Sequence, residues 1–145
     1  MTVESRIGWF HDRVLVRGIE YEVHRGRGGW HGIIDVHQPS GRVRYDAWHD
    51  RVLIESPHGP LQIQFRWRNS TFVWHGRTYR ISSMVWNRMA IWDGDRPVVE
   101  GKVTWSGVRI ERIEPPLSEI ERELAVGLGL RAVAIASAVI VPGPV

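Results

Sequence analysis

The seven histidines are the first residues whose chemistry could define a site, as metal ligands or as general bases. No pair of them has the HExxH spacing or stands four apart on an expected helix, so the sequence predicts no metal site. His24, His31 and His37 could converge only if neighbouring strands aligned them. Three others fall in expected turns, where an imidazole is simply solvated: His49, His58 and His75.

The sequence also lacks the pattern of a nucleophilic catalyst. It has no cysteine, which excludes thiolate catalysis, disulfides and Cys-ligated zinc. No serine lies in a G-x-S-x-G elbow, and the neighbours His11-Asp12 and His49-Asp50 would point to opposite faces of a strand. The glycine-rich run 26–32 opens no helix, so we interpret it as a mobile strand connection and not as a phosphate loop. We therefore predict a non-enzyme without a cofactor.

Arginine and tryptophan are the more promising set. There are eight Trp, and aromatic rings stand beside guanidinium groups at 66–68, 74–80 and 86–88. Such groups can stack on bases or contact lipid head groups and phosphates. If their strands are adjacent, one basic stripe that also includes Arg51 would bind an anionic ligand. Its candidate residues are Arg42, Arg44, Arg66, Arg68, Arg77 and Arg80.

The competing interpretation is that the Trp residues pack inside the domain and that the Arg residues are merely solvated on its outer face. We expect at least five of the eight Trp to be mostly buried, among them Trp67, Trp74 and Trp92, which alternate with polar neighbours. The formal net charge is only +3, which is too small to argue by itself for nucleic acid or anionic lipid. Nucleic acid is not an expected partner, and no pattern identifies a protein partner.

The elements that would position these side chains are short strands. Leu61, Ile63, Phe65 and Trp67 alternate with polar residues, as a sheet with one buried and one wet face requires. Turn-forming residues recur every six to ten positions, for example at 39–41, 57–60 and 93–94. We predict one domain over 1–145, mainly β, with roughly ten to twelve strands over about 7–113 that form a sandwich or closed antiparallel barrel.

A different pattern follows Pro115-Pro116. Ser118 and Glu121 have the spacing of a capping box, and we predict a helix over about 118–141. From Leu124 this helix is apolar on every side except at Arg131 and Ser137, so it is either buried in protein or a C-terminal membrane anchor. Its glycines and alanines make it thin enough for the inside of a small barrel, which is the arrangement we expect. Arg131 must then reach a carboxylate, carbonyl groups or the barrel mouth.

Several motifs in the second half of the chain resemble those of the Tubby C-terminal-like superfamily, which includes LURP-one-related proteins and phospholipid scramblases. The motifs are 72–79 (FVWHGRTY), 90–94 (AIWDG), 97–99 (PVV) and 124–132 (LAVGLGLRA). The resemblance covers about Thr71 to Val141 and implies a closed barrel with the apolar helix through its centre. The inserted Arg96-Pro97 and the helical Arg131 depart from the family's pattern.

These observations lead to a non-enzymatic β-barrel binding or scaffold domain. By the resemblance, its ligands would be anionic membrane lipid head groups or phosphates. The alternative is a calycin-like barrel that carries a small apolar ligand, because Gly29-Trp30-His31-Gly32 resembles the glycine-tryptophan motifs of such barrels. An open cavity would require the helix to lie outside. The N-terminus has no apolar stretch typical of a secretory signal, so we expect a cytoplasmic protein that is peripheral to the membrane.

Overall fold

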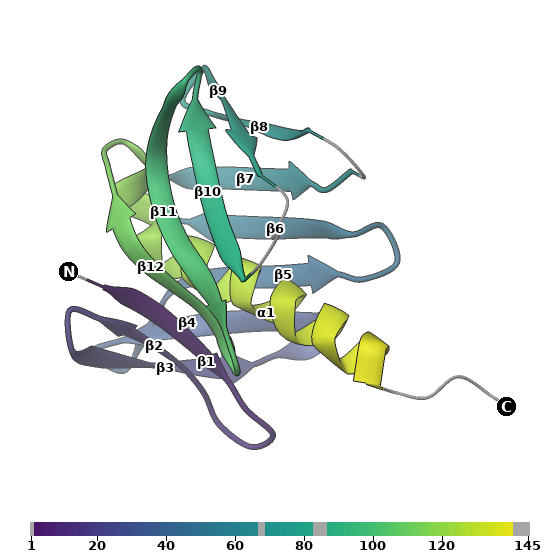
Figure 1. The fold of residues 1–145 in the computed structure, drawn as a ribbon. Helices are drawn as coiled ribbons and strands as arrows, with labels where there is room; N and C mark the ends of the chain where they lie inside the picture. The colour runs from purple at the N-terminus through teal and green to yellow at the C-terminus, as the bar shows by residue number, and fades with distance from the viewer. Residues whose placement is uncertain (1, 67–68, 83–86, 141–145) are drawn as a thin grey trace, which may run out of the picture.

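The computed structural model describes residues 2–66, 69–82 and 87–140, without the side chains of Gln38 and 138–140. Within this part of the chain, twelve strands form one antiparallel sheet that curls into a nearly closed barrel around a C-terminal helix (Figure 1). The strands are β1 (Val3–Ile7), β2 (Asp12–Val16), β3 (Ile19–Arg25), β4 (Trp30–Asp35), β5 (Gln38–Asp46), β6 (Arg51–Ser56), β7 (Gly59–Gln64), β8 (Ser70–Trp74), β9 (Arg77–Ile81), β10 (Arg88–Asp93), β11 (Arg96–Thr104) and β12 (Gly107–Ile113). The predicted fold class is confirmed.

The sheet runs in the order β7-β6-β5-β4-β3-β2-β1-β12-β11-β10-β9-β8. Its two edge strands are therefore consecutive in the chain, and they lie side by side without a hydrogen-bonded ladder (Figure 1). We call this gap between β7 and β8 the seam. It is crossed at one end by side chains, because Glu119 lies 2.6 Å from His75 Nε2 and 3.7 Å from His58 Nδ1. These two histidines occupy the β8–β9 and β6–β7 turns.

The alternation of apolar and polar residues in the sequence corresponds to side chains that point alternately into and out of the barrel. Leu61, Ile63 and Phe65 are all buried in the core, as predicted; Trp67 lies outside the described residues. One predicted turn is wrong. Residues 39–41 belong to β5, and the chain reverses at Val36 and His37, which both have positive φ.

Gly41 does not form a turn, but it allows β5 to lie close to the helix. A Cβ atom there would lie 2.8 Å from Glu123 Oε1, so the glycine lets the strand approach the helix.

The helix α1 (Glu121–Ile140) follows a 3-10 turn, η2 (Leu117–Ile120), and passes through the barrel (Figure 1). Its first half and η2 form the centre of the core. The side chains with 0% exposure here are Leu117, Ile120, Leu124, Ala125, Val126 and Leu128. The predicted burial of this apolar run is confirmed for its first half, up to Ala132, whereas residues 135–137 are exposed and the side chains beyond them lie outside the described part. Among the described residues, no helix has the length and hydropathy needed to cross a membrane.

Two glycines explain how a helix fits inside so narrow a barrel. A Cβ atom on Gly127 would lie 2.5 Å from Val52 Cγ1, and one on Gly129 would lie 2.2 Å from Ser5 Oγ. Both distances are too short for real contacts, so the helix backbone itself packs against β6 and β1. The expectation that glycines make the helix thin is therefore met at Gly127 and Gly129.

The helix begins differently from the prediction. The 3-10 turn has Pro116 as its N-cap and no side-chain cap hydrogen bond, so Ser118 does not start the helix. The Glu121 carboxylate instead receives a hydrogen bond from Arg17 Nη2 at 3.0 Å, on the β2–β3 turn. An ion pair with a distant strand therefore takes the carboxylate that a capping box would have used.

Candidate functional site

The connections of the barrel alternate between its two ends, because consecutive strands are antiparallel. We call the end where α1 begins the entry end. It holds the two-residue turns 17–18, 36–37, 57–58, 75–76 and 94–95. The exit end is the opposite one, towards which α1 emerges (Figure 1). It holds the connections 8–11, 26–29, 47–50 and 105–106, together with the start of β8 and of β10.

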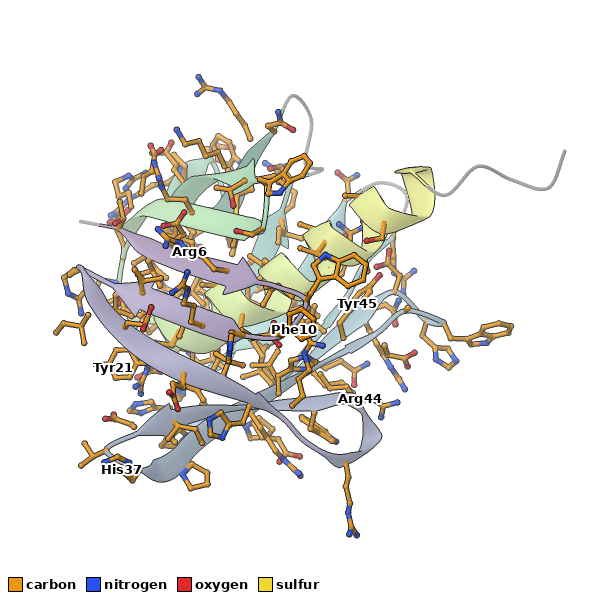
Figure 2. The ribbon with its side chains drawn as sticks, turned by 90° about the horizontal axis from the view of Figure 1, so that it is seen from below. Arg6, Phe10, Tyr21, His37, Arg44 and Tyr45 are labelled. Carbon is orange, nitrogen blue, oxygen red and sulfur yellow. The ribbon has the colours of Figure 1, made fainter. Side chains whose placement is uncertain are left out.

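Exposed aromatic side chains mark the exit end. Trp9 and Phe10 are each 90% exposed in the β1–β2 connection, Trp48 is 90% exposed in the β5–β6 connection, and Trp105 is 96% exposed in the β11–β12 turn. Figure 2 shows Phe10, Arg44 and Tyr45 on the side towards which the helix emerges, with Tyr21 and His37 towards the other end. Large aromatic rings exposed to this degree make no contribution to the core, so packing does not explain them.

The connection that carries Trp9 and Phe10 is held by a buried carboxylate. Asp12, 6% exposed, accepts a hydrogen bond from Gly8 N at 3.0 Å and two from Arg25, at 2.7 and 3.0 Å. The Asp12 carboxylate raises the pKa of the Arg25 guanidinium through these hydrogen bonds. A hydrogen bond of 2.6 Å from Ile7 N to Ser106 O places the Trp105 turn beside this connection.

Two aspartates shape the connection that carries Trp48. Asp46 binds the ring of His49 at 2.8 Å and Arg51 Nε at 3.0 Å. These interactions, of which the His49 hydrogen bond is the strongest, lower the pKa of Asp46 to about 2. Asp50 ends the connection with a φ of 49°.

Asp50 is also the partner of the helical arginine. Arg131 donates to both of its oxygens, at 2.9 and 3.1 Å, and the guanidinium lies 3.9 Å from the centre of the Phe65 ring. The prediction that Arg131 reaches a carboxylate is confirmed. Partial burial acts against ionisation of Asp50, but hydrogen bonds from Arg131 and Tyr45 outweigh it and lower its pKa. Burial, together with the hydrogen bond to Asp50, raises the pKa of Tyr45 to about 12.

Most of the arginines of the barrel are neutralised by a carboxylate, at both of its ends. Among the described residues, twelve arginines have a carboxylate partner and five have none. Four of these five lie in exit-end connections or in the adjoining ends of strands, and we call them the exit arginines: Arg27, Arg44, Arg66 and Arg88. Arg80 does not belong to this group, because it lies opposite Trp92 on β10, close to the entry-end turn 94–95. The aspartates in this region, Asp12, Asp46 and Asp50, each bind another arginine, so they do not neutralise this set.

The structure separates the six arginines predicted to form a stripe. Arg44 and Arg66 belong to the exit arginines, whereas Arg80 lies opposite Trp92 on β10, closer to an entry-end turn. Arg42 is paired with Glu55 at 2.6 Å and stacks over Trp30, whereas Arg77 binds Asp93 at 2.9 Å beside an entry-end turn. β5 and β9 are separated by β6, β7 and β8 across the seam, and Arg68 lies outside the described residues.

Burial of tryptophan is less extensive than expected. Trp74 is 3% exposed and donates to Glu119 at 3.0 Å, whereas Trp92 is half-buried and stacks under Arg80 at 5.3 Å. Trp67 and Trp86 lie outside the described residues. Only Trp74 is fully buried among the six described, and three are almost wholly exposed, so the inward-facing interpretation fails for the turn tryptophans.

The histidines do not converge on one point. His24 contacts Glu22, His31 lies 3.7 Å from Asp12, and His37 sits at the entry end. No group of three or more His, Asp or Glu within the described ranges could hold a metal ion. The glycine-rich run contains a 3-10 turn, η1 (Arg27–Gly29), between β3 and β4.

Sequence reasoning left Arg27 and Arg88 out of the predicted stripe, although it noted the group at 86–88, and it missed the aromatic residues in the turns. It looked for alternation along strands, and residues in connections do not alternate. The signal that could have found them is the parity of the connections. In an up-and-down sheet every second connection lies at the same end, and Trp9, Arg27, Trp48 and Trp105 fall in the first, third, fifth and eleventh.

We compared the chain with known proteins and found no relative. No protein family, no curated protein and no solved structure matches the chain.

Proposed function

We propose that this chain is a non-enzymatic barrel domain that binds an anionic phospholipid surface through its exit end. The observation that carries the proposal is the gathering there of four of the five arginines without a carboxylate partner among the described residues. A guanidinium already paired with a carboxylate must exchange that partner for a phosphate. An unpaired one is free to bind phosphate, often in a bidentate geometry.

The alternative, a barrel that carries a small apolar ligand, has less support. It needs an open interior with the helix outside, whereas the helix occupies the barrel with side chains such as Leu124 and Leu128 at 0% exposure. We extend the proposal to membership of the Tubby C-terminal-like superfamily, because a barrel threaded by its C-terminal helix agrees with the motif resemblance. A shared fold does not by itself give a function, so the arginines remain the main support.

The first prediction concerns these arginines. Each basic side chain near an anionic membrane surface contributes about 1 kcal/mol, so the variant R27E/R66E/R88E should bind vesicles of phosphatidylcholine and phosphatidylserine roughly 100-fold more weakly than the wild type. Wild-type binding should fall steeply with added salt, because screening acts within about 10 Å at 0.1 M ionic strength. Vesicle sedimentation over a salt series measures both effects, and far-UV circular dichroism checks the fold.

The matched control is R17E/R77E/R96E, which changes the net charge equally at exposed residues beside the entry-end turns. It should bind vesicles far better than the exit variant. Equal loss in both variants would mean that only overall charge matters, and equal binding by wild type and exit variant would refute the proposal. Competition with glycerophosphoserine and with inorganic phosphate tests the source of the phosphate. Full displacement by either would indicate a soluble phosphate ligand.

A further inference from the structure

The exposed aromatic residues of the exit end require an explanation beyond charge. Trp9, Phe10, Trp48 and Trp105 are 90–96% exposed, although the chain could place polar residues in these turns as it does in most entry-end turns. Large exposed aromatic groups that gather on one surface mark an interaction site.

The three tryptophans come from three different hairpins. Trp9 and Trp105 lie on neighbouring connections, whereas Trp48 follows β5, which is separated from β1 by β4, β3 and β2. A partner on the side wall of the barrel could reach at most part of this set. A flat surface facing the exit end can contact all three rings together.

The helix leaves the barrel towards the same surface. Arg131 is the last helical residue that is tied to the wall by an ion pair among the described ones, and α1 continues for nine residues, roughly 13 Å at ~1.5 Å per residue. Ile135, in this stretch, is 42% exposed. The end of the molecule that carries the exposed rings therefore also presents the apolar side chain of Ile135.

The geometry points to end-on insertion of the exit end into the interfacial layer of a phospholipid bilayer. The indoles of Trp9, Trp48 and Trp105 would lie at head-group depth, where tryptophan is favoured because one edge is apolar and the other donates a hydrogen bond. The exit arginines around them would meet the lipid phosphates, and this charge complementarity favours a bilayer over a protein partner. The inference rests on the proposed function and specifies how the same surface binds.

The test compares the full chain with W9S/W48S/W105S on phosphatidylcholine–phosphatidylserine vesicles. An aromatic side chain can bury about 150–250 Å², so we expect the variant to partition at least roughly 100-fold more weakly. The wild type should also keep measurable binding at high salt, because apolar insertion is not screened. Brominated lipids should quench wild-type Trp fluorescence more than that of the variant.

A matched control removes exposed apolar residues elsewhere. I19S/V36S/V73S changes side chains that are 60%, 85% and 57% exposed, outside the exit-end connections, and should bind like the wild type. The single variant W48S decides the orientation, because Trp48 lies away from the other two rings. Undiminished binding by W48S would overturn the end-on arrangement.

The remaining outcomes separate the two proposals. If wild type and triple Trp variant bind equally and brominated lipids quench neither, insertion is wrong although binding through the arginines stands. If the wild type binds no anionic vesicle, both proposals are wrong, and a protein partner for the aromatic end is the alternative that replaces them. The quenching measurement on the wild type holds even if a variant fails to fold.

Discussion

At the scale of single residues, Asp50 and Glu123 show two different environments of a carboxyl group in the barrel, the first partly exposed and the second buried. Arg131 and Asp50 neutralise each other where the helix leaves the wall, and Tyr45 completes the arrangement with a 2.7 Å hydrogen bond to Asp50. Glu123 is the opposite case. It is 2% exposed, and its Oε2 has no hydrogen-bond partner among the described residues. An unpaired buried carboxylate is costly when charged, so Glu123 limits the stability of the domain.

Burial raises the pKa of Glu123 above its ordinary value of 4.5. Because the folded pKa is the higher one, the favourable contribution of the protonated group is complete below pH 4.5 and is lost as the pH rises through the folded value. Glu123→Gln removes this titration. The variant should therefore gain stability relative to the wild type between pH 4 and pH 7, by an amount on the order of 1–3 kcal/mol.

Urea unfolding at both pH values measures this change, with Glu111→Gln as a control on an exposed carboxyl group. A constant difference between Glu123→Gln and the wild type at both pH values would show that Glu123 is not titrating in the folded core.

At the scale of elements, the helix can pack closely against the barrel wall because its glycines have no side chain at the contact. Gly127→Ala should improve helix propensity by about 1 kcal/mol, but the new Cβ would lie 2.5 Å from Val52 Cγ1. Overpacking costs about 1–3 kcal/mol, and the valine cannot move far within the wall, so we expect net destabilisation.

Val52→Ala removes the methyl group that clashes most and leaves Val52 Cβ at 3.7 Å from the new atom, while Val43 Cγ1 would still lie 3.2 Å from it. In the double variant each change therefore compensates in part for the other, and a coupling of about 0.5–3 kcal/mol should appear in a double-mutant cycle of denaturant unfolding. Strictly additive effects would mean that the helix shifts away from β6 when Gly127 is replaced.

The turn η2 helps to close the seam between β7 and β8. Glu119 receives the indole hydrogen of Trp74 at 3.0 Å and lies against His75 and His58, so one carboxylate joins the turns on both sides of the seam. The helix thus completes the barrel in two ways. It fills the interior, and the turn that precedes it covers the only junction in the described sheet that has no backbone ladder.

At the scale of the whole molecule, the sequence predicted what depends on local pattern. Alternation located Leu61, Ile63 and Phe65 on the inner face, and the apolar run located the helix and its arginine. It could not predict the turn at Val36 and His37, because Gly41 serves a close approach that only the folded helix reveals. The search for alternation along strands did not group Trp9, Trp48 and Trp105, because their common end follows from the number of strands between them and not from the pattern within any one strand.

The last prediction follows from the helix as the centre of this core. Deleting residues after Pro116 removes five large aliphatic side chains that are 0% exposed: Leu117, Ile120, Leu124, Val126 and Leu128. At about 1.5–3 kcal/mol for each fully buried aliphatic side chain, their loss is comparable with the whole stability of a domain, about 5–15 kcal/mol. The truncated chain should therefore be insoluble or molten, without near-UV circular dichroism or a cooperative thermal transition.

A chain that ends at Ser137 is the control for this deletion. It keeps every side chain of the helix that the structure describes as buried, so it should stay in the supernatant and unfold cooperatively like the intact chain. A helix that served only to attach the domain to a membrane would give a different result. The chain without residues 117–145 would then be a folded β protein with a sharp melting transition, because the strands of the barrel would be stable without the helix inside them.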